Sequence, residues 1–158
     1  MNSGANNRSP LYFEDLAVGQ IYRTKSLTVD ADAIKTFAAS FDPQPFHLDE
    51  AKAANTFFGG LAASGWHTAA LTMRLLVTEG APIAGGIIGV GMDELRWPRP
   101  VRPGDRLRLE SEVLETRVSR SRPEQGLVKM RTMTLNQDDE PVQIIVGNLV
   151  VPRRTATA

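Results

Sequence analysis

The chain has 158 residues, of which 42% are hydrophobic and 23% are charged, so it has the length and composition of one globular domain and not of a disordered or collagen-like protein. Its 18 Lys and Arg residues balance its 18 Asp and Glu residues, so no net field favours nucleic acid or an anionic membrane as a partner. The lack of cysteine excludes disulfides, a thiolate nucleophile and cysteine-bound zinc.

No apolar run approaches the roughly 18 residues that cross a membrane. Residues 1–10 are polar and lack the apolar centre of a signal peptide, so we expect a disordered N-terminal tail and a cytoplasmic protein. A single domain is expected over residues 11–152, followed by a C-terminal tail over residues 153–158.

The first predicted elements are a strand and a helix. Residues 20–29, QIYRTKSLTV, have the composition of a strand. Asp30 can then cap a helix in which apolar residues recur at helical spacing, namely Ile34, Phe37, Ala38 and Phe41. One face of this helix is therefore expected to be buried.

Two prolines shape the next segment. Pro43 disfavours helical geometry at Asp42, so the helix should end there. We therefore interpret FDPQPFH, residues 41–47, as a loop between two helices. Asp49 can cap the second helix, which is expected to be short and to cover residues 50–58.

A longer helix is predicted over residues 64–80, SGWHTAALTMRLLVTEG. Its apolar residues leave almost no polar face, and a helix that is apolar nearly all round belongs in the interior of a protein. His67 and Arg74 are seven positions apart on this helix, so both can face one polar region. We interpret His67 as structural, because buried, hydrogen-bonded histidines are common.

The sequence after this helix changes to strand periodicity. Four strands separated by turn signals are predicted, over residues 86–97, 105–117, 126–136 and 142–151. Leu107, Leu109 and Val113 alternate with charged residues, as in a sheet with one face in water. These segments predict an α+β fold, in which a curved antiparallel sheet of about five strands wraps around the long helix and short helices precede it. The unpaired edges of such a sheet favour edge-to-edge dimerisation.

Several common kinds of site do not occur in the sequence. The chain has two histidines, they do not form an HExxH motif, and no thiolate is present, so we predict no metal. GGIIGVG contains GxG but leads into a strand and not a helix, which argues against dinucleotide binding. Most arginines after residue 95 fit a solvated strand face. Arg99 and Arg102, near a Pro-Gly turn, are the candidates for contact with an anionic ligand.

Asp42 and His47 form the strongest candidate site, although on spacing alone both are ordinary loop residues. Pro43 and Pro45 restrict the segment between them, and phenylalanines beside both suggest packing that shifts pKa values toward neutrality. Gly65, at the start of the long helix, offers an N–H that the helix dipole makes suitable for a developing oxyanion.

Three stretches together resemble a known family. DPQPFH at residues 42–47, SGWHTAALT from Ser64 onward and PVRPGDRL at residues 100–107 are similar to motifs of the MaoC-like dehydratases, which include the (R)-specific enoyl-CoA hydratases. The likeness extends from about Tyr12 to Val151.

The resemblance implies a hot-dog fold, a homodimer or dimer of dimers, and an acyl-CoA or acyl-carrier thioester as substrate, with no cofactor other than the CoA of the substrate. It implies that Asp42 and His47 hold the catalytic water and that the Gly65 N–H binds the thioester carbonyl. Two positions depart from the family pattern. Gln44 stands where the family usually has asparagine, and Ser64 stands where it often has histidine.

Three hypotheses follow for the function. The leading one is a lyase that adds water reversibly to a trans-2-enoyl thioester to give the 3-hydroxyacyl thioester, because that reaction needs a base, an acid and an oxyanion donor. The second is an acyl-CoA thioesterase on the same fold, in which Asp42 directs water to the carbonyl carbon. The third is a non-catalytic acyl-thioester-binding module, which the departures at Gln44 and Ser64 suggest.

Overall fold

The computed structural model describes residues 8–155. A short 3-10 helix, η1, covers Phe13–Asp15, and the α-helices are α1 (Ala31–Phe41), α2 (Pro45–Leu48), α3 (Glu50–Ala53) and α4 (Gly65–Glu79). The strands are β1 (Ile21–Arg23), β2 (Leu27–Thr28), β3 (Ile88–Arg96), β4 (Arg106–Val118), β5 (Gln125–Leu135) and β6 (Pro141–Pro152).

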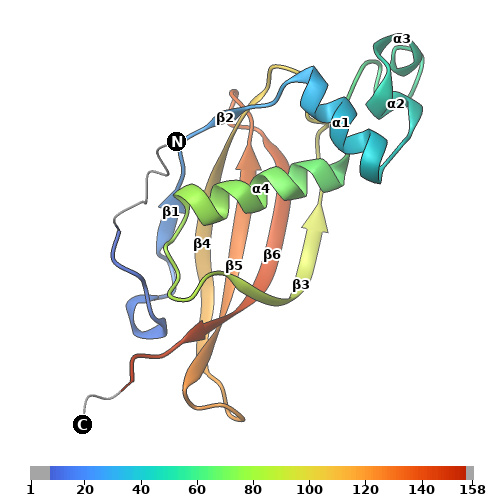
Figure 1. Ribbon diagram of the computed structural model, residues 1–158. Coiled ribbons are helices and arrows are strands. Elements are labelled where there is room, and N and C mark those ends of the chain that lie inside the picture. The colour runs from blue at the N-terminus through green and yellow to red at the C-terminus, as the bar shows by residue number, and fades with distance from the viewer. Residues whose placement is uncertain (1–7, 156–158) are drawn as a thin grey trace, which may run out of the picture.

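The strands form one antiparallel sheet in the order β1-β4-β5-β6-β3, and β2 also pairs with β4. The sheet curves around α4, which crosses it, while α1, α2 and α3 lie together near one end of α4 (Figure 1). This is the predicted helix-in-sheet arrangement, with six strands in place of about five. Because β3 pairs with β6 alone, one of its sides forms an edge of the sheet.

The predicted strand over residues 20–29 is divided into β1 and β2. Thr24 explains the interruption, since its hydroxyl accepts a hydrogen bond from the Leu109 N–H (2.9 Å) and thereby takes the place of a backbone carbonyl in the ladder. Lys25 and Ser26 then leave the sheet before Leu27 rejoins it.

The prediction that residues 41–47 form a loop was wrong in part. Pro43 does end α1 at Phe41, but Pro45 starts α2, where a missing N–H costs nothing because the first helical N–H groups have no partner within the helix. His47 therefore lies on a helical turn. The next helix, α3, ends at Ala53, earlier than expected, where the Thr56 hydroxyl donates to the Ala53 carbonyl (2.7 Å).

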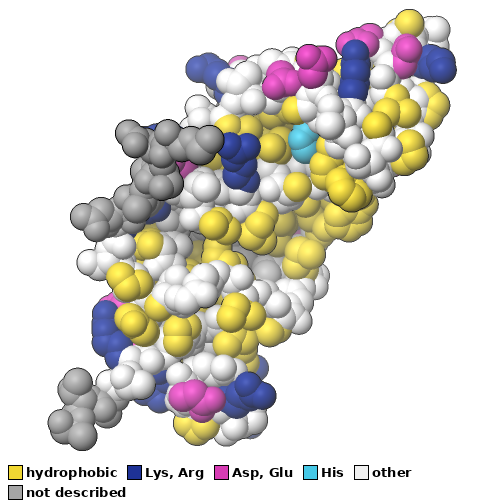
Figure 2. All heavy atoms as spheres, viewed as in Figure 1, with side chains coloured by type: hydrophobic (Ala, Val, Ile, Leu, Met, Phe, Trp, Pro, Cys, Tyr) yellow, Lys and Arg dark blue, Asp and Glu magenta, His cyan; other side chains and the backbone are white. Residues whose placement is uncertain are grey.

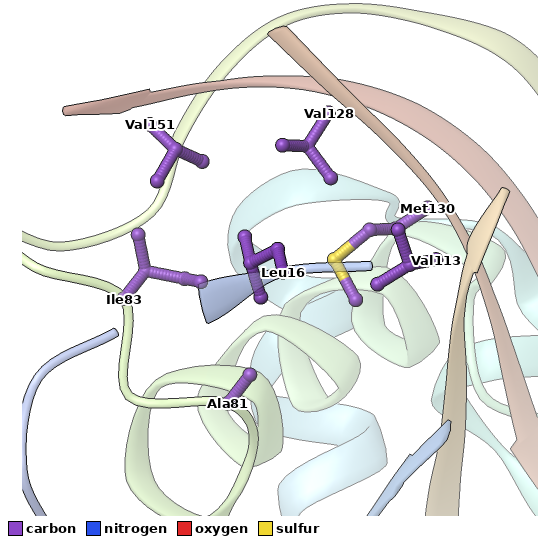
Figure 3. Packing of buried hydrophobic residues seen from close by; sticks show 7 residues of the cluster. All are labelled: Leu16, Ala81, Ile83, Val113, Val128, Met130 and Val151. Atoms are coloured by element: carbon purple, nitrogen blue, oxygen red, sulfur yellow. The ribbon is translucent and has the colours of Figure 1, made fainter. Parts of the chain in front are cut away.

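The core forms where the sheet meets α4 and the segments around it. Leu107, Leu109 and Val113 of β4 are completely buried, as their alternation predicts. One cluster combines side chains of β4, β5 and β6 with side chains that precede or follow α4 in the chain. Its members are Leu16, Ala81, Ile83, Val113, Val128, Met130 and Val151 (Figure 3). Ala81 and Ile83 directly follow α4, so these contacts anchor the C-terminal end of that helix to the sheet.

Helix α4 is covered only partly by its own chain. Met73 is 48% exposed and Val77 is 65% exposed, and on the edge strand β3 Val90 is 61% exposed. Hydrophobic side chains gather on this face of the molecule, over α4 and the strands beside it (Figure 2). The prediction of a fully enclosed helix is therefore not met within one chain.

The two ends of the described chain are held together. Arg153 forms an ion pair with Glu14 (3.1 Å), and Arg154 forms one with Asp15 (2.7 Å). The expected C-terminal tail is thus anchored at its first two residues, while residues 1–7 and 156–158 lie outside the described part. Over residues 8–155, no helix is long and apolar enough to cross a bilayer.

Candidate active site

The predicted residues Asp42, His47 and Gly65 line one cavity of about 470 Å³, together with Trp66, Trp97 and Arg99 among others. Asp42 is the C-cap of α1, His47 lies on α2, and Gly65 opens α4. The break between α1 and α2 at Pro43 lets two helices deliver an acid and an imidazole to the start of a third.

The His47 ring is oriented by two contacts. Nδ1 lies 2.6 Å from the Ala62 carbonyl oxygen, and Nε2 lies 3.3 Å from Oδ2 of Asp42. A carbonyl oxygen can only accept, so the Nδ1 atom carries the hydrogen and, in the neutral ring, Nε2 presents a lone pair. The Asp42 carboxylate and Nε2 are then two neighbouring acceptors to which one water molecule can donate.

The Asp42 carboxylate is held in its ionised form. Partial burial raises its pKa, but hydrogen bonds from Gln44 and Ser64 and the electrostatic interaction with His47 outweigh that effect and leave the pKa below its usual value. Nε2 of Gln44 lies 2.5 Å from Oδ1 of Asp42. Both departures from the family pattern, Gln44 and Ser64, thus contact the carboxylate.

The N–H of Gly65 is available to a ligand. Ser64 caps α4 by accepting from the Trp66 N–H (3.2 Å), and the Thr68 N–H donates to the Ser64 carbonyl (3.1 Å), whereas the Gly65 N–H has no acceptor within residues 8–155. The N-terminus of this 15-residue helix carries partial positive charge. The cavity therefore combines a carboxylate, an imidazole and a free backbone donor.

The two arginines proposed for an anionic ligand differ in position. Arg102 donates to the carbonyls of Gly60 (2.9 Å), Leu61 (3.3 Å) and Phe58, so its guanidinium holds the loop that precedes α4. Arg99 lines the cavity, is 3.6 Å from Glu140, and its side chain is 44% exposed. Arg99 is therefore the better placed of the two to meet a bound anion.

The aromatic wall of the cavity includes Phe57, Trp66 and Trp97. Trp97 was not among the predicted site residues; it is the last residue of the strand predicted over residues 86–97 and precedes Pro98. Trp66 and Trp97 pack edge to face with their centroids 5.3 Å apart, and Trp97 lies against Gly65.

His67 lies outside this cavity, as the structural interpretation requires. It is 6% exposed, stacks on Phe37 with ring centroids 4.8 Å apart, and lines a separate polar cavity that Arg74 also lines. Its Nδ1 has no hydrogen-bond partner in the described part of the chain, so the expected hydrogen bond at this atom is not found. Burial lowers the pKa of His67, which keeps the ring neutral at pH 7.

The described residues bring no three His, Cys, Asp or Glu side chains together in a way that could hold a metal ion.

Comparison with known proteins identifies the family. Residues 14–134 match the model of the MaoC like domain. The chain belongs to the MaoC-like dehydratase family. A crystal structure of a MaoC-like dehydratase from Rhodospirillum rubrum is 56% identical and superposes with a TM-score of 0.89, covering 92% of this chain and 99% of that one.

Two further proteins that resemble this chain are named by activity. The unliganded (R)-hydratase PhaJ1 from Pseudomonas aeruginosa is 31% identical with a TM-score of 0.74, and the match covers 94% of this chain and 92% of that chain. A 3-hydroxybutyryl-CoA dehydratase from Methylorubrum extorquens is 36% identical over 105 residues, which are 66% of this chain and 65% of the relative. The predicted family and hot-dog fold are confirmed, and the family is one of hydratases and dehydratases.

Proposed function

We propose that this protein adds water reversibly to a trans-2-enoyl thioester to form the 3-hydroxyacyl thioester. Asp42 and His47 hold and activate the water, and the Gly65 N–H polarises the thioester carbonyl. The single observation that carries the proposal is the 3.3 Å contact between Asp42 Oδ2 and His47 Nε2 in a cavity that also contains the free Gly65 N–H.

The first chemical step follows from these groups. A water molecule that donates to both acceptors has its oxygen lone pair directed away from them and toward the substrate. Attack of this oxygen on the β-carbon transfers one water proton to the Asp42–His47 pair. The electrons of the double bond move toward the thioester carbonyl, whose oxygen becomes enolate-like and accepts from the Gly65 N–H.

The second step returns a proton to the α-carbon. The protonated Asp42–His47 pair is the proton source, because the imidazolium formed at His47 is stabilised by the adjacent carboxylate. Transfer of the proton regenerates both acceptors and yields the 3-hydroxyacyl thioester, and dehydration is the reverse sequence. Every atom of the added water is thus accounted for without a redox change.

The substrate is proposed to be a CoA or carrier-protein thioester. Arg99 is the side chain best placed to meet a phosphate of such a substrate, because it borders the cavity and remains partly exposed. A CoA phosphate contact at Arg102 would compete with the three carbonyls that this residue already serves.

A second copy of the chain is proposed to pair with β3. The free side of β3 leaves backbone donors and acceptors unpaired, and an antiparallel edge can pair with itself across a two-fold axis. Such pairing would also cover exposed apolar side chains of β3, namely Val90 and Met92, the second of which lines a cavity with Met73 of α4. Homodimerisation thus accounts for two features that one chain leaves unexplained.

The reaction is tested by following the loss of the conjugated double bond of enoyl-CoA substrates of graded length. Asp42→Asn is expected to lower turnover by at least about 100-fold with the fold intact, because it removes a general base. Full activity of this variant would reject the mechanism.

The thioesterase alternative is tested in the same samples. Release of free thiol from a saturated acyl-CoA would favour hydrolysis of the thioester, whereas the proposed hydratase releases none. Binding of acyl-CoA without conversion of any enoyl or hydroxyacyl substrate would instead identify a binding module.

A further inference from the structure

A chain of hydrogen bonds connects the cavity wall to the interior of the sheet. Trp97 Nε1 donates to Gln143 Oε1 (2.8 Å), Gln143 Nε2 donates to Thr72 Oγ1 (2.9 Å), and Thr72 Oγ1 lies 2.6 Å from Thr134 Oγ1. Gln143 and Thr134 are completely buried, and Thr72 is 1% exposed. These hydrogen bonds therefore connect the proposed active site through β6 and α4 to β5.

The direction of these bonds is set by Trp97. An indole N–H can only donate, so Gln143 must turn its oxygen toward Trp97 and its NH₂ group toward Thr72. Leaving a buried amide unpaired is unfavourable, and both ends of Gln143 are paired here. Gln143 thus has one favoured orientation and holds the indole in one place.

The indole held in this way lies directly against Gly65. A β-carbon at position 65 would approach Cε2, Cδ2 and Cζ2 of Trp97 to 2.6, 2.8 and 2.9 Å, which is far inside the separation that two carbons tolerate. Trp97 also lines the cavity that contains Asp42 and His47. Any carbonyl bound to the Gly65 N–H must therefore lie beside the indole.

We infer that Trp97 is a positioning residue of the thioester subsite and that Gln143 fixes its orientation. The inference rests on the proposed hydratase function and extends it. The indole is the wall that aligns the thioester carbonyl with the Gly65 N–H. Gln143 is completely buried and does not line the cavity, and its hydrogen bond to Trp97 is its contact with the cavity wall. A displacement of about 1 Å in such a subsite can cost up to about 100-fold in rate.

The test compares Gln143→Met with Thr134→Val. Gln143→Met has a similar length and removes the acceptor of Trp97. Thr134→Val also removes a buried hydrogen bond but leaves both bonds of Gln143 in place, so it is the matched control for loss of stability. Thermal unfolding and circular dichroism of both variants establish that each is folded.

We expect Gln143→Met to lower kcat for hydration of crotonyl-CoA by about 10-fold, with KM changed by less than about 3-fold, relative to Thr134→Val. A structural role alone would lower the stability of both variants and leave their kcat values alike. Equal kcat in the two variants overturns the inference.

Tryptophan fluorescence provides a readout that does not depend on turnover. The chain has two tryptophans, so Trp66→Phe leaves Trp97 as the reporter. In this background we expect saturated butyryl-CoA to change the Trp97 emission, and we expect Gln143→Met to shift the emission of the free protein and to weaken that change.

The two proposals fail in different ways. Calorimetric binding of butyryl-CoA with no change in Trp97 emission overturns the role of Trp97, whatever the activity. A protein that binds butyryl-CoA with a changed Trp97 emission but hydrates no enoyl-CoA supports the role of Trp97 at a thioester subsite and rejects the proposed reaction.

Discussion

The two ends of helix α4 differ in what holds them. At the first turn, Gly65 meets Asp42 and His47 in a cavity where directed hydrogen bonds place each polar group. Two to three turns later, Met73 and Leu76 line a second cavity of about 270 Å³, whose walls are mostly apolar. Hydrogen bonds are directional and apolar contacts are not. Substitutions at the first turn of α4 should therefore change the rate of the reaction. Substitutions near the apolar cavity should change stability and self-association.

Outside the Asp42–His47 pair, the largest effect on the reaction is expected at Gly65, where Trp97 lies against the backbone. Gly65→Ala should lower kcat/KM by about 100-fold, because the added methyl group displaces Trp97 and misaligns the oxyanion donor. Steady-state hydration kinetics measure this loss. A double variant with Trp97→Leu should be no slower than Gly65→Ala alone, since both substitutions disturb one contact, and independent, additive losses would contradict that coupling.

Self-association can be disrupted at the free edge of β3. Val90→Glu on β3 should weaken self-association by about 10-fold or more, because two-fold pairing of β3 brings the new carboxylates close together, and Glu115 lies nearby. Sedimentation velocity over a range of concentrations measures this change. Val18 is 64% exposed, close to the 61% of Val90, but precedes β1 at the other side of the sheet. Val18→Glu should therefore leave association unchanged, and equal weakening by both variants would reject the β3 interface.

The pKa of Asp42 provides a test of the hydrogen bonds at the first turn of α4, with a smaller expected effect. Because the Ser64 hydrogen bond lowers the pKa of Asp42, Ser64→Ala should raise that pKa and move the acid limb of the kcat/KM profile to higher pH. The variant also loses the N-cap of α4, at a cost of about 1 kcal/mol. Asp49→Ala removes the N-cap of α3 and is the control. If the acid limb of the profile stays at the same pH in Ser64→Ala, Ser64 does not lower the pKa of Asp42.

The smallest effect on stability or activity is expected at His67, which lines neither the catalytic cavity nor the apolar cavity at the other end of α4. Burial lowers its pKa in the folded state, so the unfolded chain takes up a proton first as pH falls. Stability should therefore decline as pH falls from the ordinary pKa of histidine toward the lowered folded value. Urea unfolding at pH 7.5 and at pH 5 should show less of this decline in His67→Gln. An identical decline in both proteins would assign it to other groups.

Much of the fold was predictable because its signals are local. The spacing of Ile34 and Ala38 predicts α1, and the alternation of Leu107, Leu109 and Val113 predicts the buried face of β4. The division of the first strand was not predictable, because the Thr24 hydroxyl replaces a backbone carbonyl only when it faces Leu109, which is 85 residues away.

The candidate site was predictable in its residues and not in its surroundings. The motif at residues 42–47 and the glycine at position 65 can be recognised in the sequence alone. Pro43 disfavours helical geometry at Asp42, which explains why α1 ends at Phe41. The contact of Ser64 with Asp42 and the position of Trp97 over Gly65 depend on segments that only folding brings together.

The sequence by itself determined α1, α4 and the four long strands, the family, and the acid, imidazole and glycine of the candidate site, because periodicity and motif spacing are local properties of the sequence. The tertiary structure alone decided which hydrogen bonds hold those groups, which arginine borders the cavity and which face of α4 stays uncovered. Those features depend on packing between residues far apart in the chain, and the local sequence around each residue does not predict such packing.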